Sequence, residues 1–240
     1  MATPRPTPTQ TSETHVIDLD VWSDFVCGHC YYGTRRVTKA LSLLPDPHAV
    51  RVRWRGFQLD PRPAGERPSG DLYDYLAQFN GSRAAGRAAM ERIGAIAAGD
   101  GLPFHPDRAR PGNTVAAHRL VHLAAQEGRA TEVLLRLYTA YWTEGLPIAD
   151  PAALRDLAAG AGLDPARAQA VLDGDEFADA LAADQLRAAQ VGVTGVPTLV
   201  VDGRWAVSAA RPAETIAAEL RLLSQERDGR DLPNRKGDEA

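Results

Sequence analysis

Two segments in the first quarter of the chain alternate between apolar and polar residues, His15–Trp22 and Val50–Phe57. A period of two residues is typical of a β-strand that buries one face. Between them, His29–Leu44 carries apolar residues at helical spacing, and Pro45 and Pro47 end this helix. We therefore predict a strand, a helix and a second strand that form a βαβ unit.

The alternation returns near the C-terminus. Val196–Val201 is predicted as a strand, Asp202-Gly203 as a tight hairpin turn, and Arg204–Val207 as the returning strand. Pro212 suits the first turn of a closing helix that runs to about Leu223. These elements supply a second half for the same small sheet.

Strand patterns nearly vanish between the two halves, from about Ala64 to Val191, and helical patterns separated mostly by Gly or Pro replace them. The segments predicted as helices are Asp71–Asn80, Ser82–Ala98, Asn113–Glu127, Thr131–Glu144, Pro151–Ala161, Pro165–Leu172 and Glu176–Gln190. We predict an α/β fold in which residues 15–63 and 192–224 form one domain and residues 64–191 form an inserted helical domain. Residues 1–14 and 225–240 are expected to be flexible tails.

Composition narrows the classes of partner. The chain has 27 basic and 31 acidic residues, interspersed, with a net charge of −4. The sequence shows no basic face of the kind that binds nucleic acid, so nucleic acid is not an expected partner. No apolar run approaches the roughly 20 residues of a membrane span, so no membrane segment is expected. The chain starts at Met1 without a secretory signal, so we expect a cytoplasmic protein, as a monomer or a homodimer.

The two cysteines of the chain, Cys27 and Cys30, lie in one C-x-x-C motif. A structural disulfide, two inert thiols and half of a zinc site are the alternatives to a redox pair. A zinc site would need two further ligands, for which His118 and His122 have the nearest suitable spacing, although such a pair is more often a polar helix stripe. The position between a strand and a helix favours the redox pair, with no metal.

Thiol–disulfide exchange requires a thiolate, and a helix N-terminus stabilises one at Cys27. We expect Cys27 to form a mixed disulfide and Cys30, one turn further along, to resolve it. Gly28 allows a tight entry into the helix, and a protonated His29 would lower the pKa of Cys27 further. A stabilised thiolate predicts a potential in the oxidising half of the range from about −270 to about −120 mV known for such enzymes.

Other candidate site residues carry weaker signals. Asp24 is a candidate for moving a proton to or from Cys30, or else a turn former. Asn113 most simply caps a helix, and His118 and Trp142 line a cleft between the domains or pack in the core. An apolar rim around the sulfur, suited to peptide substrates, is predicted from Phe25, Tyr31 and Tyr32.

Several segments resemble the DsbA family, in particular its FrnE-type branch of cytosolic thioredoxin-fold oxidoreductases. They are WSDFVCGHCYYG (Trp22–Gly33), GVTGVPTLVVDGRWAVSAARP (Gly192–Pro212), NTVAAHRL and LYTAYWTEG. The resemblance implies a thioredoxin domain with a helical insertion. It also implies a cis peptide at Val196-Pro197, whose loop faces the disulfide and presents the backbone of Val196 to an extended substrate. Gly-His between the cysteines departs from the Pro-Trp usual in this branch and is similar to protein disulfide isomerase.

The expected function is disulfide exchange on protein or small-molecule substrates, with no cofactor beyond the Cys27–Cys30 disulfide and with glutathione as a candidate reductant. One alternative is a glutathione-dependent enzyme like the kappa-class glutathione transferases and 2-hydroxychromene-2-carboxylate isomerases, which use a single serine. Another is a chaperone that holds unfolded chains in the helical cleft and does not need Cys27.

Overall fold

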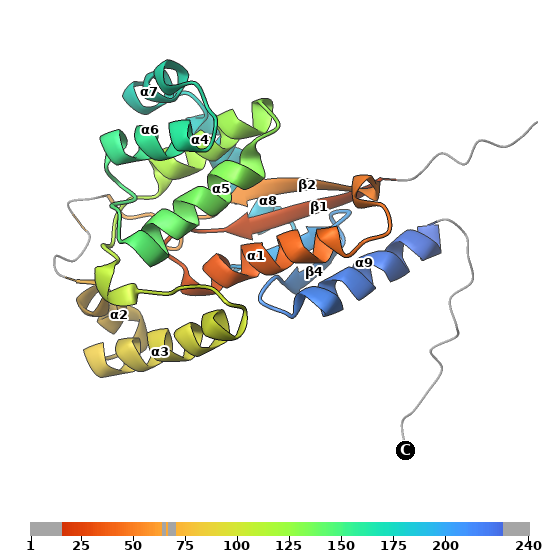
Figure 1. Cartoon of the computed structure of the whole chain (residues 1–240), viewed down its shortest axis with the longest axis horizontal. Helices are drawn as coiled ribbons and strands as arrows, with labels where there is room; N and C mark the ends of the chain where they lie inside the picture. Colours follow the sequence, from red (N-terminus) through yellow and green to blue (C-terminus); the bar gives the residue numbers. More distant parts are fainter. Residues whose placement is uncertain (1–15, 64–65, 67–70, 228–240) are drawn as a thin grey trace, which may run out of the picture.

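The computed structural model describes residues 16–63, 66 and 71–227, so His15 and most of the two predicted tails lie outside the described residues. Its sheet has four strands in the order β2-β1-β3-β4. The strands are β1 (Ile17–Ser23), β2 (Val50–Gly56), β3 (Thr198–Val201) and β4 (Trp205–Ser208). β1 pairs with β2 in parallel and with β3 antiparallel, so the two ends of the chain build one sheet (Figure 1).

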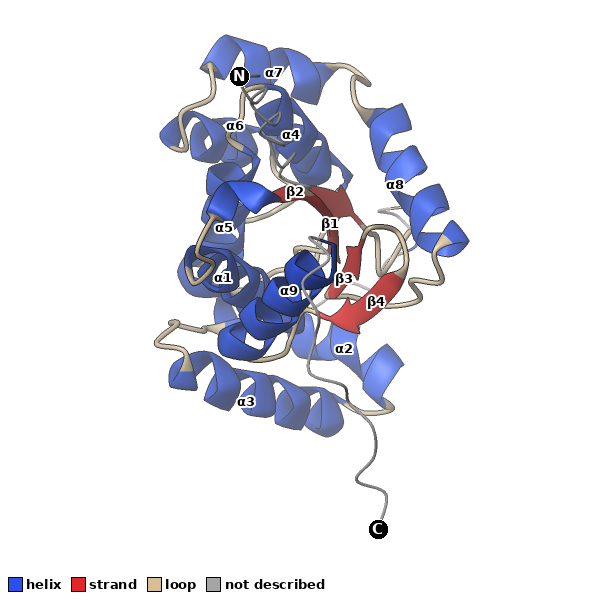
Figure 2. Cartoon of the chain, turned by 90° about the vertical axis from the view of Figure 1, so that its right-hand side faces the viewer, coloured by secondary structure: helices blue, strands red, loops and turns tan. Residues whose placement is uncertain are grey.

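Helices cover both faces of this sheet (Figure 2). Helices α1 (Gly28–Ser42) and α9 (Ala213–Arg227) lie on one face, where the apolar side chains of β1 are buried in the main core. On the other face, Trp22 packs against Ala188 of α8 (Ala178–Gln190). Helix α9 continues to Arg227, beyond the predicted end at Leu223.

The remaining helices lie between the two halves of the sheet in the sequence. They are α2 (Leu72–Asn80), α3 (Arg83–Gly99), α4 (Val115–Gln126), α5 (Ala130–Thr139), α6 (Pro151–Gly160) and α7 (Pro165–Asp173), with a short 3₁₀ turn, η3 (Pro106–Arg108), between α3 and α4. Another 3₁₀ turn, η1 (Pro47–Ala49), lies earlier in the chain, between α1 and β2. The helix predicted over Thr131–Glu144 is α-helical only as far as Thr139, because the chain then widens into a π-helical turn, η4 (Ala140–Glu144).

Helix α8, which the sequence placed in the insertion, is joined directly to the sheet. The Asp184 carboxylate accepts hydrogen bonds from the Gly56 N–H (2.8 Å) and from Arg55 (2.9 Å). Arg55 also pairs with Asp20, a β1 carboxylate whose side chain is only 8% exposed. The strand β1 is therefore buried at Asp20 as well. The charge of Asp20 is tolerated there because it is paired and hydrogen-bonded.

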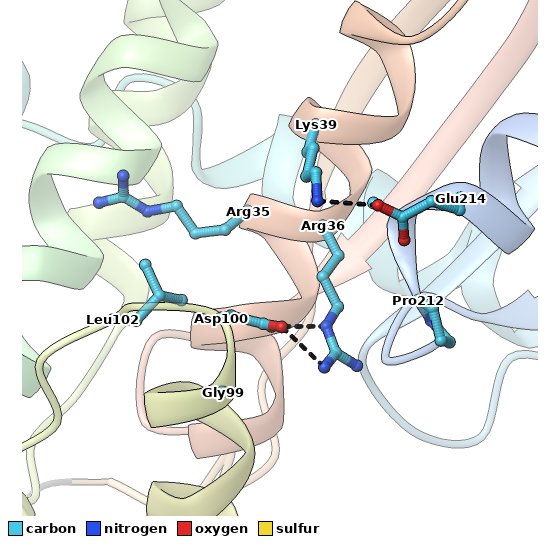
Figure 3. A pocket seen from close by; sticks show the side chains of 9 residues that line it. Arg35, Arg36, Lys39, Gly99, Asp100, Leu102, Pro212 and Glu214 are labelled. Carbon is cyan, nitrogen blue, oxygen red and sulfur yellow. Dashed lines mark hydrogen bonds and ion pairs between the residues drawn. The ribbon is translucent and has the colours of Figure 1, made fainter.

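Ion pairs tie the middle of α1 to two distant parts of the chain (Figure 3). Arg36 binds Asp100, at the end of α3, with a 2.6 Å contact, and Lys39 binds Glu214, in the first turn of α9, with a 2.8 Å contact. The Arg36 guanidinium also donates to the Ala210 carbonyl at 2.6 Å. These contacts surround a pocket of about 230 Å³ and hold α1 between its neighbours.

Candidate active site

Cys27 is the residue from which α1 starts. Its backbone is extended, and its carbonyl accepts hydrogen bonds from the N–H groups of Cys30 (3.0 Å) and Tyr31 (3.3 Å). The Cys27 N–H in turn donates to the Asp24 carbonyl (3.1 Å), which closes the turn after β1. The sulfur of Cys27 therefore lies at the positive end of the helix, as the sequence predicted.

The two sulfurs differ in access and in acidity. Cys27 keeps 8% of its surface exposed, whereas Cys30 is fully buried. A hydrogen bond from the Cys30 thiol, together with the His29 imidazole, lowers the pKa of Cys27 to about 6, although burial opposes the shift. Burial, that same hydrogen bond and the Cys27 charge raise the pKa of Cys30. Cys27 is thus poised to be a thiolate at neutral pH while Cys30 keeps its proton.

The loop before β3 lies beside the Cys27 sulfur. The Val196-Pro197 peptide is cis, as the family resemblance implied, and the Val196 carbonyl oxygen is 3.7 Å from the Cys27 Sγ. A Cβ atom at Gly33 would lie 2.9 Å from the Pro197 Cγ, so the absence of a side chain there lets the proline rest on α1. Beyond the proline, the Ala209 N–H donates to the Pro197 carbonyl at 3.0 Å.

Beneath the cysteines, Asp24 is 1% exposed and makes several hydrogen bonds. Its Oδ2 accepts from the Leu59 N–H (2.9 Å), its Oδ1 lies 3.4 Å from the His118 Nε2, and its carbonyl accepts from the Tyr138 hydroxyl (3.0 Å). After the larger causes given above, a hydrogen bond with the Asp24 backbone lowers the pKa of Cys30, and the charge of the Asp24 carboxylate raises it. The structure therefore brings Asp24 and His118 together with the cysteine pair.

The aromatic rim predicted from Phe25, Tyr31 and Tyr32 is wrong, because these residues are at most 2% exposed. The Tyr31 hydroxyl donates to the Pro103 carbonyl (2.8 Å). Trp142 lies in the core as well, where its Nε1 donates to the Phe25 carbonyl (2.9 Å). These side chains hold the cysteine turn from below rather than surrounding the sulfur.

Asn113 and His122 take structural roles. The Asn113 Oδ1 accepts from the Val115 N–H (2.8 Å) and so satisfies the first N–H of α4, whose N-cap residue is Thr114. The His122 Nε2 lies 2.9 Å from the Asp184 carboxylate, whereas His118 lies near a different carboxylate, that of Asp24. Among the residues that the structure describes, no three His, Cys, Asp or Glu side chains converge on a metal-sized site.

Two hollows flank the reactive sulfur. One, of about 500 Å³, is lined by His29, the Gly192–Thr198 loop and part of β4. The other, of about 300 Å³, lies between the start of α1 and helices α2 and α3. Sequence reasoning missed the second hollow, because the helical spacing of apolar residues in α2 and α3 indicates a buried face but not what that face meets.

A thioredoxin-like sheet with inserted helices, a C-x-x-C pair at a helix N-terminus and a facing cis-proline are the features of the DsbA-like thioredoxin family. The family model for a DSBA-like thioredoxin domain matches residues 18–221, and the chain belongs to this family. The probable DsbA oxidoreductase SCO1869 from Streptomyces coelicolor is similar to it, at 34% identity and a TM-score of 0.79, over 93% of this chain and 94% of that one.

Two further solved structures share the fold. The cytosolic disulfide reductase DsbM from Pseudomonas aeruginosa, also solved with GSH, is 23% identical in the form without it, with a TM-score of 0.61 over 85% of this chain and 99% of its own. A 2-hydroxychromene-2-carboxylate isomerase is 15% identical, with a TM-score of 0.67 over 90% of this chain and 100% of its own. No helix in the described part of this chain has the length and apolar character needed to cross a membrane.

Proposed function

We propose that the protein is a thiol–disulfide oxidoreductase that exchanges disulfides through Cys27, the attacking thiolate, and Cys30, the resolving thiol. The observation that carries the proposal is the position of the Cys27 sulfur. It lies at the N-terminus of α1, 3.7 Å from the Val196 carbonyl that precedes a cis-proline, and its pKa is lowered to about 6. A nucleophilic sulfur therefore lies directly beside a stretch of backbone able to pair with an extended peptide.

In the reducing direction, the Cys27 thiolate attacks a substrate disulfide. A bond forms between Cys27 and one substrate sulfur, and the other substrate sulfur leaves as a thiolate. Cys30 then gives up its proton and attacks the Cys27 sulfur, which releases the second substrate thiolate and leaves the Cys27–Cys30 disulfide. The substrate gains two electrons, and the reverse sequence oxidises a dithiol.

We assign Asp24 to the transfer of the Cys30 proton. Its carboxylate is buried close enough for its charge to act on the Cys30 thiol, and the His118 Nε2 lies 3.4 Å from its Oδ1. His29, which is exposed beside Cys27, completes the set of groups that act on the two sulfurs.

Glutathione is the proposed reductant, and the cytoplasm the proposed location. The fold is shared with DsbM, which is described as a cytosolic disulfide reductase and has been solved with GSH. In the cytosol the glutathione pool would return the Cys27–Cys30 disulfide to the dithiol after each turnover.

The test compares the wild type with Cys27→Ser and Cys30→Ser in insulin reduction and in glutathione buffers of graded ratio. We expect a reversible disulfide in the wild type, loss of insulin reduction in Cys27→Ser, and a persistent mixed disulfide with glutathione in Cys30→Ser, detected by mass. A wild type that forms no reversible disulfide contradicts the proposal. So does a Cys27→Ser variant that still reduces insulin.

The same variants separate the alternatives. A glutathione-dependent isomerase or transferase is suggested by the fold shared with the 2-hydroxychromene-2-carboxylate isomerase. Such an enzyme needs only one nucleophile, so its activity would be retained in Cys30→Ser. A chaperone would suppress aggregation of an unfolded protein equally well in wild type and Cys27→Ser.

A further inference from the structure

The proton of Cys30 has to move within a buried site. Cys30 is fully buried, and Asp24, the group assigned to accept its proton, is 1% exposed. If that proton left for solvent before Cys30 attacked, the Cys30 thiolate and the Asp24 carboxylate would be two negative charges in one buried site, which is costly. The attacking thiolate is therefore more accessible if a second base keeps the proton within the site.

His118 is the base that lies next to Asp24. Among the residues that the structure describes, the Asp24 carboxylate has two hydrogen-bond partners, the Leu59 N–H and the His118 imidazole. An amide cannot take up a proton at neutral pH, whereas a neutral imidazole can. The Tyr138 hydroxyl reaches only the Asp24 backbone carbonyl, and burial raises its pKa, so this phenol keeps its proton. The 3.4 Å from His118 Nε2 to Asp24 Oδ1 is long for a hydrogen bond, as is common for proton-transfer pairs that tighten during a reaction.

The fold holds the His118 ring against Asp24. His118 is 3% exposed on α4, and its ring packs against Phe25 with centroids 4.9 Å apart. A Cβ atom at Gly56 would lie 3.2 Å from the His118 Cγ and Nδ1, so the absence of a side chain there lets the ring rest against the end of β2. Phe25, Gly56 and the neighbouring Leu181 of α8 carry no charge. In the described part of the chain, Asp24 is the charged group paired with the ring.

The chemistry of the two side chains gives the proton a direction. Imidazole is ordinarily a stronger base than a carboxylate, with a pKa of about 6.5 against about 3.9. A proton that Asp24 has taken from Cys30 is therefore held more firmly one step further on, at His118. Transfer requires a neutral ring that carries its hydrogen on Nδ1, because Nε2 is then free to accept.

We propose that His118 holds the Cys30 proton during resolution of the mixed disulfide. The proton passes from Cys30 to Asp24 and on to the His118 Nε2, which increases the fraction of Cys30 present as the attacking thiolate. The inference rests on the proposed function and on the role of Asp24 in it. His118 acts through Asp24 and is in this sense a positioning residue.

Protons and electrons balance in this sequence. Cys30 gives up its proton, and its lone pair forms the bond to the Cys27 sulfur. The substrate sulfur leaves as a thiolate with the electron pair of the broken bond. The His118 imidazolium and the Asp24 carboxylate remain as a neutral pair, and the imidazolium then returns its proton to solvent.

The test follows the two thiols that the reduced enzyme releases, in a single turnover, from the disulfide-linked dimer of the peptide Ser-Ala-Cys-Ala-Ser. Rapid quenching and chromatography separate the two releases. The first reports the attack of Cys27 on the substrate, and the second reports the attack of Cys30 on the mixed disulfide. The first release therefore also shows, in every variant, whether the site is folded.

The proteins compared are the wild type, His118→Gln, Asp24→Asn and the double variant. The matched control is His122→Gln, because His122 lies on the same helix, beside a different buried carboxylate, that of Asp184. We expect His118→Gln to slow the second release about tenfold at pH 7 and to leave the first nearly unchanged. The double variant should be no slower than Asp24→Asn, because His118 acts through Asp24. His122→Gln should match the wild type in both releases.

The pH dependence separates a proton acceptor from a structural support. Cys27 is bonded to substrate before the second release and has no thiol to titrate, so this step depends on Cys30, Asp24 and His118. The wild-type rate should rise as His118 loses its proton and then level off, because the Cys30 proton stays within the site. In His118→Gln the rate should continue to rise as hydroxide removes the Cys30 proton, so the deficit narrows at alkaline pH. A loss of packing would instead slow the step by the same factor at every pH.

A wild-type second release in His118→Gln would overturn the inference. So would a deficit that is constant with pH, an equal slowing of both releases, or effects of His118→Gln and Asp24→Asn that multiply in the double variant. In each of these cases, release of both thiols by the wild type would leave the proposed function standing. A wild type that releases neither thiol would refute the proposed function itself.

Discussion

The acidity of Cys27 has a consequence for redox potential that can be calculated. At pH 7 a thiol with a pKa of about 6 is about 90% ionised, against about 1% for a thiol at the ordinary value of 9.0. Ionisation stabilises the reduced protein by about 1.4 kcal/mol at this pH, which raises the midpoint potential by about 30 mV. The ionisation of Cys27 would therefore contribute only about 30 mV toward the oxidising potential predicted from the sequence, and that potential stays a prediction.

His29→Ala tests this reasoning, because His29 is exposed and its imidazole is one of the groups that lower the pKa of Cys27. Loss of the hydrogen bond from this imidazole, together with its electrostatic effect, should raise the pKa of Cys27 by about one unit, toward about 7. The reduced form then loses about 1 kcal/mol of stabilisation at pH 7, and the potential falls by about 20 mV. The hydrogen bond from Cys30, which is the larger cause, stays in place.

The measurement is the thiolate absorbance near 240 nm of the reduced protein as a function of pH. Below pH 8 the signal belongs to Cys27, because the pKa of Cys30 is raised above the ordinary value of 9.0. His48→Ala, an exposed histidine in the turn after α1, is the matched control and should leave the midpoint unchanged. A wild-type midpoint near 9 would refute the assignment of Cys27 as the thiolate, and an unchanged midpoint in His29→Ala would remove His29 from the mechanism.

Three other predictions follow from the same geometry. Because the pKa of Cys27 is lower in the folded reduced protein than in the unfolded chain, its contribution to stability is complete above about pH 9 and is lost as the pH falls through about 6. Between pH 8 and pH 5, the free energy of unfolding of the reduced wild type, measured in urea, should therefore fall by about 3 kcal/mol more than that of Cys27→Ser. Gly33→Ala would place a Cβ 2.9 Å from the Pro197 Cγ, so it should cost about 1–3 kcal/mol of unfolding free energy and slow reduction of peptide disulfides. Asp24→Asn should slow the attack of Cys30 on the mixed disulfide by about a hundredfold, measured as release of the second peptide thiol, and should leave release of the first nearly unchanged.

Each of these predictions has a result that contradicts it. Parallel pH profiles for wild type and Cys27→Ser would show that no ionisation of Cys27 is linked to folding. If Gly33→Ala reduced peptide disulfides at the wild-type rate, then a displacement of Pro197 would not affect the reaction with the substrate. If Asp24→Asn slows both thiol-release steps equally, Asp24 supports the turn and does not handle the proton of Cys30.

Local sequence patterns were sufficient for the strands of the sheet against which the cysteine-bearing helix α1 packs. Period-two alternation located β1 and β2, and Asp202-Gly203 marked the turn between β3 and β4, where both residues have positive φ. The cis peptide at Val196-Pro197 was implied only by family resemblance, because a proline at the start of a strand has no local signal for the cis form.

Features that depend on tertiary packing escaped the sequence. Hydrophobicity alone does not distinguish side chains exposed around the sulfur from side chains buried beneath it. The sequence therefore predicted Phe25 and Tyr31 at the surface, whereas both are buried. The same limit applies to α8, whose sequence pattern shows an amphipathic helix but not that Asp184 bonds to the backbone of β2. Side-chain partners across more than a hundred residues are set by the assembled fold.

In the proposed exchange reaction, the unequal burial of the two sulfurs sets the order of events at the site. A protein thiol cannot reach Cys30, which is fully buried, so every mixed disulfide must form at Cys27. Cys27, with a pKa of about 6, is also the better leaving group of the two, since a thiolate leaves faster as its pKa falls. Release of substrate from Cys27 by an incoming thiol is thus favoured, whereas resolution by Cys30 must first remove a proton that burial holds in place. The balance between oxidising, reducing and isomerising substrates therefore depends on how quickly that buried proton moves.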